Sequence, residues 1–205
     1  HDIHSHVLPG VDDGVRTYGE SIIVLKGLSS LGVKRVTCTS HVYFPALMNG
    51  RENLYPLLED LRAGLQKEEV EIELDLGAEY RVGEYMLSLI ERGEILSGDD
   101  NRVLVEHNFL SPSPFFDQVV FELQTRGYEV VLAHPERYVF WEDDIVRHGE
   151  ELKNKNCRLQ VNILSFAGYY GKEAQRGAER LHDAGLIDYY AGDVHGMRHV
   201  EAIKK

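Results

Sequence analysis

The sequence predicts an α/β protein in which seven parallel strands close into a distorted (β/α)7 barrel. Short β-type runs alternate with amphipathic helical stretches along the whole chain. Histidines and carboxylates follow the ends of these strands, about one β/α unit apart. A closed ring brings such positions together, whereas an open sheet spreads them along a line. We therefore expect a metal site at the C-terminal ends of the barrel strands.

Taken in order, the strands are expected at residues 2–6, 34–39, 71–78, 102–106, 129–133, 158–163 and 187–192. Helical periodicity occupies residues 18–31, 52–68, 84–92, 115–126, 142–155 and 172–184. Left-handed helix ends are expected at four glycines: Gly32, Gly93, Gly127 and Gly185. No linker, low-complexity run or block of charge interrupts the alternation, so residues 1–205 are expected to form a single domain.

Composition excludes several classes of protein. The formal net charge of −12 argues against a nucleic-acid partner, because no basic stripe is present to neutralise phosphates. No apolar run reaches the roughly 18 residues that a membrane span needs, so stable membrane insertion is not expected. Cys38 and Cys157 are too few for a disulfide framework and favour a reducing cytoplasm.

The pair His4 and His6 is the strongest local signal. Side chains two residues apart on a strand point to the same face, so both imidazoles can reach one ion. Such a pair alone is equally typical of surface or packing histidines. It gains weight because more candidate ligands occur at the ends of later strands: His41, Glu79, Glu106, His134, Asp193 and His195. A cluster without thiolates suits manganese, iron or zinc.

Each candidate also has a structural interpretation. His41 could cap a strand, and His134 could be a core histidine. Glu79 and Glu106 follow apolar strands, where an unpaired carboxylate is costly, and this favours metal ligands. Asp12 and Asp13 lie in a turn-like segment, in which Asp13 is the better candidate ligand. Three other histidines are expected to be solvated on helix faces: His148, His182 and His199.

Together these segments resemble the PHP (polymerase and histidinol phosphatase) superfamily. The resemblance covers essentially the whole chain, in order. It rests on DIHSH (2–6), LPGVDDG (8–14), TSH (39–41), GAEY (77–80), HPERY (134–138) and DVH (193–195). The LPGVDDG and HPERY segments are the most specific, and they are similar to bacterial protein-tyrosine phosphatases of capsule and exopolysaccharide operons.

The resemblance implies a seven-stranded barrel with three divalent ions, commonly manganese, with iron or zinc as alternatives. By motif, the ions would be held by His4, His6, Glu79 and Asp193, by Glu79, Glu106 and His134, and by Asp13, His41 and His195. Arg137 would contact the phosphate. The implied substrate is a phosphotyrosine protein, namely a bacterial tyrosine kinase that controls polysaccharide export. The oligomeric state stays open.

Other activities fit the sequence less well. Cysteine phosphatases need C-x5-R, but Phe44 and Ile163 stand where arginine would follow Cys38 and Cys157. A small-molecule phosphomonoesterase of the histidinol-phosphate type and a metal-dependent nuclease would share the metal ligands. A non-enzymatic binding module is the alternative from another class. For Arg137, the alternative to phosphate binding is a salt bridge with Glu136 or Glu142.

Overall fold

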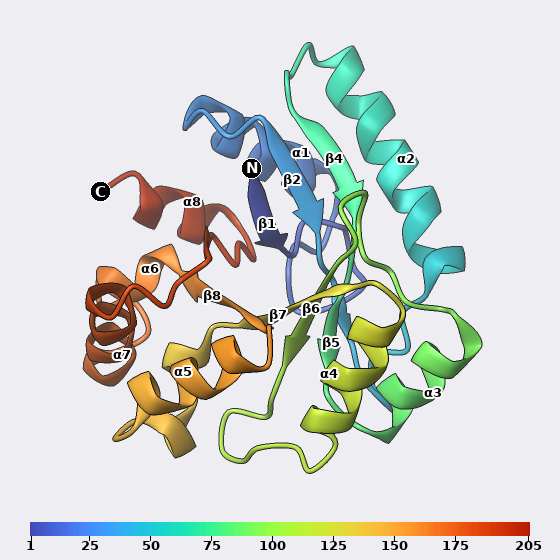
Figure 1. Ribbon diagram of the computed structural model, residues 1–205. Helices are drawn as coiled ribbons and strands as arrows, with labels where there is room; N and C mark the ends of the chain where they lie inside the picture. Colours follow the sequence, from blue (N-terminus) through green and yellow to red (C-terminus); the bar gives the residue numbers. More distant parts are fainter.

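The computed structural model describes residues 1–205 and shows an α/β fold with parallel sheets (Figure 1). The strands are β1 (Asp2–Ser5), β2 (Arg35–Cys38), β3 (His41–Val42), β4 (Glu73–Leu76), β5 (Glu79–Arg81), β6 (Arg102–Glu106), β7 (Glu129–Ala133), β8 (Arg158–Asn162) and β9 (Tyr189–Ala191). They form one sheet of order β1-β2-β4 and a second of order β3-β5-β6-β7-β8-β9. Every named strand pair is parallel, as the alternating pattern predicts.

The two sheets are connected along both edges. Only Thr39 and Ser40 separate β2 from β3, and the Ser40 carbonyl accepts a hydrogen bond from Glu79 N at 3.2 Å across this interruption. At the other edge, His6 N donates to Val194 O at 2.9 Å, so the segment after β9 lies beside the end of β1. The sequence predicted one strand over 34–39 and one over 71–78, and the structure adds a short segment beyond each.

Helices lie outside the strands in Figure 1. They are α1 (Tyr18–Ser30), α2 (Arg51–Lys67), α3 (Glu84–Arg92), α4 (Phe116–Thr125), α5 (Ile145–Asn154), α6 (Ile163–Phe166), α7 (Lys172–Asp183) and α8 (Met197–Ile203), with 3-10 turns η1 (Pro135–Arg137) and η2 (Val139–Trp141). The predicted left-handed helix ends are confirmed, because the four glycines all have positive φ angles, between 67° and 87°. The helix expected over 142–155 begins only at Ile145, because η2 and a turn precede it.

Local signals explain where helix α1 begins. Thr17 caps it: the Thr17 hydroxyl accepts from Glu20 N at 3.3 Å, and the Glu20 carboxylate accepts from Thr17 N at 3.2 Å. This reciprocal box satisfies two backbone donors that the first turn leaves free. The same carboxylate also accepts from Arg16 N at 2.8 Å, so the loop after β1 enters α1 in one fixed path.

Two apolar layers lie on opposite faces of the strands. The larger layer packs between strands and helices and includes Val103, Val105, Val130 and Leu132. The smaller layer faces the interior and consists of Ile3, Leu104, Val131, Ala133 and Ala191, from four different strands. Since neighbouring residues of a strand point to opposite faces, this alternation leaves the strand ends free to carry polar groups above the inner layer.

None of the helices combines the length and the apolar character that crossing a lipid bilayer requires.

Candidate metal centre

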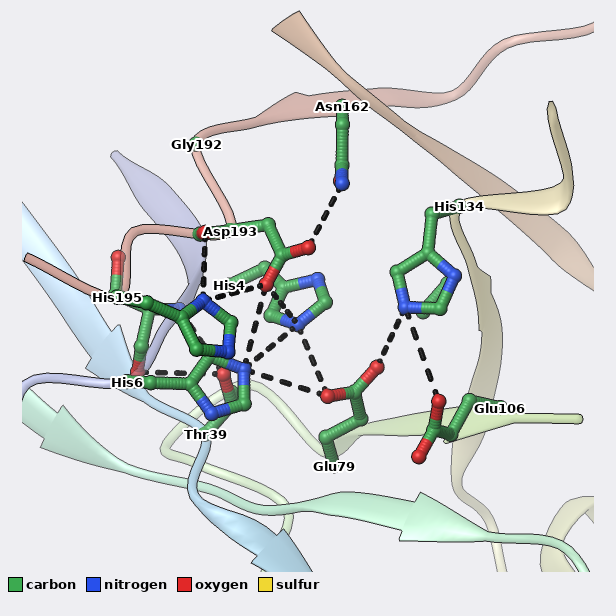
Figure 2. Close-up of polar contacts among 12 residues, drawn as sticks. His4, His6, Thr39, Glu79, Glu106, His134, Asn162, Gly192, Asp193 and His195 are labelled. Atoms are coloured by element: carbon green, nitrogen blue, oxygen red, sulfur yellow. Dashed lines mark hydrogen bonds and ion pairs between the residues drawn. The ribbon is translucent and has the colours of Figure 1, made fainter. Parts of the chain in front are cut away.

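The ends of the strands carry a continuous cluster of histidines and carboxylates (Figure 2). All nine residues that the sequence predicted as ligands belong to four overlapping groups, whose donor atoms lie within 4.8 Å of one another. The groups are His6, Asp13, His41 and His195; His4, His6 and Asp193; His4, Glu79 and His134; and His41, Glu79 and Glu106. Residues that are far apart in sequence therefore form one site.

Two of these residues have an unusual backbone. His134 and Asp193 follow β7 and β9 with φ angles of 36° and 47°, in the left-handed region. This conformation costs a residue with a Cβ roughly 1–2 kcal/mol. The turn directs both side chains toward the centre of the cluster, as Figure 2 shows. The strained backbone at His134 and Asp193 therefore coincides with the placement of two candidate ligands.

The deepest part of the cluster has the dimensions of a coordination sphere. His4 Nε2 and His6 Nε2 face each other at 3.2 Å. Glu79 Oε2 lies 3.2 and 3.3 Å from these two nitrogens, and Asp193 Oδ1 lies 3.3 and 3.4 Å from them. Donors about 2.1 Å from one ion are about 3.0–3.4 Å apart, depending on the angle between them. These four atoms therefore surround one point at the spacing that a divalent cation requires.

A relay of side-chain amides fixes which nitrogen of His4 faces this point. Asp193 Oδ2 accepts from Asn162 Nδ2 at 2.8 Å, so Asn162 Oδ1 is the atom that accepts from Gln160 Nε2 at 2.8 Å. Gln160 Oε1 is then the partner of His4 Nδ1, also at 2.8 Å, and this nitrogen must donate. Neutral His4 consequently directs the lone pair of Nε2 into the cluster, which is the form that binds metal.

Asp12 fixes which nitrogen of His6 faces the cluster. Its Oδ2 atom lies 2.9 Å from His6 Nδ1 and also accepts from His41 N at 3.1 Å. With both Nδ1 atoms donating elsewhere, the Nε2 atoms of neutral His4 and His6 present lone pairs to each other, and a proton or a metal cation between them removes that repulsion. Gly14 permits the turn, since a Cβ there would lie 2.2 Å from His6 O.

The remaining ligands extend from this point to the surface. Glu79 Oε1 lies 2.9 Å from His134 Nε2, while Glu79 Oε2 lies 3.0 Å from His41 Nδ1. Glu106 is closer to His41, at 3.4 Å, than to His134, at 3.9 Å. Asp13 Oδ1 lies 3.4 Å from His41 Nε2.

The outermost group is the most open to solvent. Asp13 Oδ1 also lies 3.3 Å from His195 Nε2, and the Asp13 side chain is 72% exposed. His41 is 14% exposed and His195 is 23% exposed, whereas the inner residues are almost fully buried. Solvent therefore reaches the cluster from this side.

The charges of the cluster favour a bound cation. Burial alone would lower the pKa of His4, but the carboxylates of Glu79 and Asp193 outweigh burial and raise this pKa. Burial would raise the pKa of Asp193, yet the surrounding histidines hold it well below its usual range. In addition, Glu79 Oε2 and Glu106 Oε2 are buried without an aligned hydrogen bond, which costs free energy unless a cation satisfies them. The donor set thus fits divalent metal ions.

The chain is similar to known proteins over almost its whole length. The family model for capsular polysaccharide synthesis, CpsB/CapC, matches residues 1–202. The chain belongs to the CpsB/CapC family. It is 29% identical over 200 residues to tyrosine-protein phosphatase YwqE of Bacillus subtilis, which covers 96% of this chain and 78% of that protein. Tyrosine-protein phosphatase CpsB of Streptococcus pneumoniae is 26% identical over 202 residues, covering 96% and 83%.

Solved structures extend the comparison to the fold. A structure from work on YwqE of B. subtilis and CpsB of S. pneumoniae, described as metal-dependent tyrosine phosphatases, matches with a TM-score of 0.89 and 27% identity. The match covers 98% of this chain and 83% of that one. The histidinol phosphate phosphatase of Lactococcus lactis matches with a TM-score of 0.57 at 12% identity, over 99% and 91% of the two chains, which shows a shared fold alone.

Arg137 of this CpsB/CapC chain lies beside the cluster, in η1 directly after His134. Its Nη1 donates to Asp193 Oδ2 at 2.9 Å, and the guanidinium stacks between the rings of Phe109 and Tyr170, 4.6 and 4.3 Å from their centroids. Arg137 therefore forms a salt bridge with Asp193, and not with Glu136 or Glu142 as the alternative from the sequence had it. Glu136 instead accepts from Asn162 N and the Ser165 hydroxyl, at 3.0 and 2.7 Å.

Several supporting residues were not recognised from the sequence. Gln160 and Asn162 stand two apart on an apolar strand, and this same-face spacing is the signal that was overlooked. His199 was expected to be solvated, but it is half-buried and its Nδ1 accepts from His195 N at 2.9 Å. Asp2 is buried and accepts from Gly192 N at 3.0 Å, which ties β1 to the turn before Asp193.

Proposed function

We propose that this CpsB/CapC protein is a metal-dependent phosphatase that removes phosphate from tyrosine residues of proteins. The observation that carries the proposal is the four-atom arrangement of His4, His6, Glu79 and Asp193. Two imidazole lone pairs and two carboxylate oxygens meet there at coordination spacing. The relatives YwqE and CpsB, which are tyrosine-protein phosphatases by name, supply the substrate class.

We further propose three ion positions, with manganese as the expected metal and iron or zinc as alternatives. The inner position uses the four residues just named, the second uses Glu79, Glu106 and His134, and the outer one uses Asp13, His41 and His195. When bound, such ions lower the pKa of water toward neutrality and offset charge on the phosphoryl oxygens. The relay through Gln160 and Asn162 keeps His4 in the metal-binding tautomer.

Arg137 is the proposed phosphate contact. Asp193 uses Oδ2 to hold one guanidinium nitrogen, and the two aromatic rings hold the plane, so the remaining N–H groups have a fixed direction. A planar, permanently charged fork suits phosphoryl oxygens. Tyrosine phenolate leaves readily because the pKa of tyrosine is near 10. Water made more acidic by bound ions would attack the phosphorus in its place, so no protein nucleophile is needed. The buried thiols of Cys38 and Cys157 take no part.

The proposal includes three points of organisation. The nine strand segments are joined, with β2–β3 and β4–β5 each continuing one strand, into a seven-stranded barrel closed between β1 and the segment after β9. Residues 1–205 act as one domain, and the free cysteines agree with a reducing cytoplasm. The physiological substrate is a bacterial tyrosine kinase that controls capsule or exopolysaccharide synthesis.

The experiment compares three substrates with the purified protein. Phosphate release is measured from a phosphotyrosine peptide and histidinol phosphate, and strand cleavage is measured on a short single-stranded oligonucleotide, in each case before and after chelator treatment and with Mn²⁺ restored. The proposal expects the highest kcat/KM on the phosphotyrosine peptide, loss with chelator and recovery with Mn²⁺. A preference for histidinol phosphate or for the oligonucleotide would replace this function with one of the alternatives.

A further inference from the structure

Arg81 lies directly beside one of the candidate metal ligands. In the parallel pairing of β5 with β6, Arg81 stands opposite Glu106. Arg81 also follows Glu79 by two residues, so the two side chains leave the same face of β5. Arg81 Nε donates to Glu106 Oε1 at 3.0 Å, and Nη2 lies 2.9 Å from the same oxygen. Both guanidinium nitrogens are therefore directed at a single oxygen of this ligand.

The two oxygens of Glu106 have different surroundings. Oε1 contacts the guanidinium, and His41 Nδ1 lies 3.4 Å from it. Oε2 is buried without a hydrogen-bond partner, 3.9 Å from His134 Nε2. A buried carboxylate oxygen that accepts no hydrogen bond costs free energy unless a cation satisfies it. Arg81 therefore satisfies one side of Glu106 and leaves Oε2 as the oxygen that is open to an ion.

The guanidinium of Arg81 is itself held in place. Its Cζ atom lies over the ring of Tyr43, 5.1 Å from the centroid. The backbone of Tyr43 exchanges two hydrogen bonds with Leu47, at 2.8 and 2.9 Å, which fixes the segment that carries the ring. A carboxylate oxygen and an aromatic face together define the position and the plane of the guanidinium. The terminal torsion of a glutamate is otherwise soft and roughly two-fold, so Arg81 selects which oxygen of Glu106 faces the cluster.

We propose that Arg81 is a positioning residue that orients Glu106 so that Oε2 alone faces the second ion position. This inference rests on the metal centre of the proposed function. A carboxylate that binds through one oxygen leaves free a coordination position that a carboxylate bound through both oxygens would occupy. Arg81 thus keeps room for water beside Glu106, which is the ligand that the proposed hydrolysis requires.

The test measures Mn²⁺ binding to the purified, metal-free protein by equilibrium dialysis. Arg81→Met keeps an apolar stem and removes every side-chain donor. The ion must then fix the terminal torsion of Glu106 itself, so we expect one class of Mn²⁺ site to bind about 10–100-fold more weakly, with the other sites unchanged. Arg81→Lys should recover part of this loss, because an ammonium group can reach an oxygen but has no plane to fix.

Arg35 provides a matched control for the loss of a buried ion pair. Arg35 Nη2 donates to Asp75 Oδ2 at 3.0 Å. The side chains of Arg35 and Arg81 are both 29% exposed, and each pairs with a buried carboxylate. Asp75 belongs to none of the candidate metal groups. Arg35→Met should therefore lower the Tm, as Arg81→Met does, while Mn²⁺ binding stays that of the wild type.

A double-mutant cycle shows whether Arg81 acts through Glu106. Glu106→Gln alone should weaken the same class of Mn²⁺ site, and adding Arg81→Met should then change the affinity little. Three results would overturn the positioning role: unchanged Mn²⁺ binding by Arg81→Met, equal weakening by Arg35→Met, or additive losses in the double variant.

Because binding is measured without substrate, this inference and the proposed function can fail separately. Arg81-dependent Mn²⁺ binding by a protein that does not hydrolyse phosphotyrosine peptides would support the positioning role and overturn the phosphatase. Hydrolysis of these peptides together with Mn²⁺ binding that is independent of Arg81 would do the reverse. A wild-type protein that binds no Mn²⁺ would overturn the metal centre and the positioning role together.

Discussion

At the scale of single residues, the amides of Gln160 and Asn162 decide which tautomer His4 adopts. Gln160→Leu removes the acceptor that His4 Nδ1 uses, whereas Asn162→Leu removes the group that orients the Gln160 amide and donates to Asp193. Supporting residues of this kind typically contribute about 10–100-fold in metal affinity. We therefore expect Gln160→Leu and Asn162→Leu to bind the metal about 10–100-fold more weakly, as measured by competition with a chelator. Gln118→Leu, at an exposed position of α4, is the matched control and should bind as wild type does.

A second prediction concerns Arg137 and the aromatic rings that hold its guanidinium. Arg137→Ala should lower kcat by about 10²–10³, as expected when one preorganised donor is removed. Tyr170→Leu should lower kcat less, because it only loosens the guanidinium, and it should add little in the Arg137→Ala background. Tyr55→Leu, which disturbs the stack on Arg51 at 4.7 Å, is the control. Additive effects of Tyr170→Leu and Arg137→Ala would show that the tyrosine acts independently of the arginine.

The cysteines allow a third prediction at this scale. Burial raises the pKa of both Cys38 and Cys157 to about 12, so both thiols remain protonated at pH 8. A thiol-directed reagent should therefore leave the native protein unmodified and active at pH 8, and it should modify two thiols only after denaturation. Rapid modification of the native protein together with loss of phosphatase activity would contradict the account.

At the scale of elements, the contact between α1 and α8 holds the end of the chain against the site. A Cβ at Gly27 would lie 2.8 Å from Val200 Cγ1 and 3.5 Å from Met197 Sδ. Overpacking of this kind costs about 1–3 kcal/mol, and the buried, β-branched Val200 places the cost in the upper part of this range. After the gain of about 1 kcal/mol in helix propensity, the net loss is about 1–2 kcal/mol. Gly27→Ala should thus lower the Tm by about 2–8 °C. Gly19→Ala, in the same helix with nothing within 4 Å, should leave the Tm unchanged or raise it. An unchanged Tm for Gly27→Ala would show that α8 is free to move.

The sequence predicted the longer elements well and missed the short ones, for physical reasons. Helix α2 places buried leucines at positions 54, 58, 61 and 65, so its period is visible in the sequence. Helices α6 and α8 span 4 and 7 residues, which is too short for a period to be measured. The short segments β3 and β5 depend on hydrogen bonds to other strands, which no local pattern reports.

At the scale of the whole molecule, the regular spacing of ligands predicted that the strand ends converge, because each β/α unit returns the chain to the same end of the sheet. The spacing could not predict the orientation of each ligand. Asp12 was treated as a turn residue or an alternative ligand, yet its contacts with His6 and His41 make it a supporting group. The hydrogen bond from Gly192 N to the Asp2 carboxylate joins residues near opposite ends of the chain, so no local sequence pattern could predict it.

The central claim is that this cluster binds divalent metal at the four inner donor atoms. The most direct measurement is anomalous scattering at the manganese edge from crystals grown with Mn²⁺. The account predicts a peak about 2.0–2.3 Å from His4 Nε2, His6 Nε2, Glu79 Oε2 and Asp193 Oδ1. It would be contradicted by crystals that show manganese elsewhere on the protein while these four atoms remain in contact with one another and hold no ion.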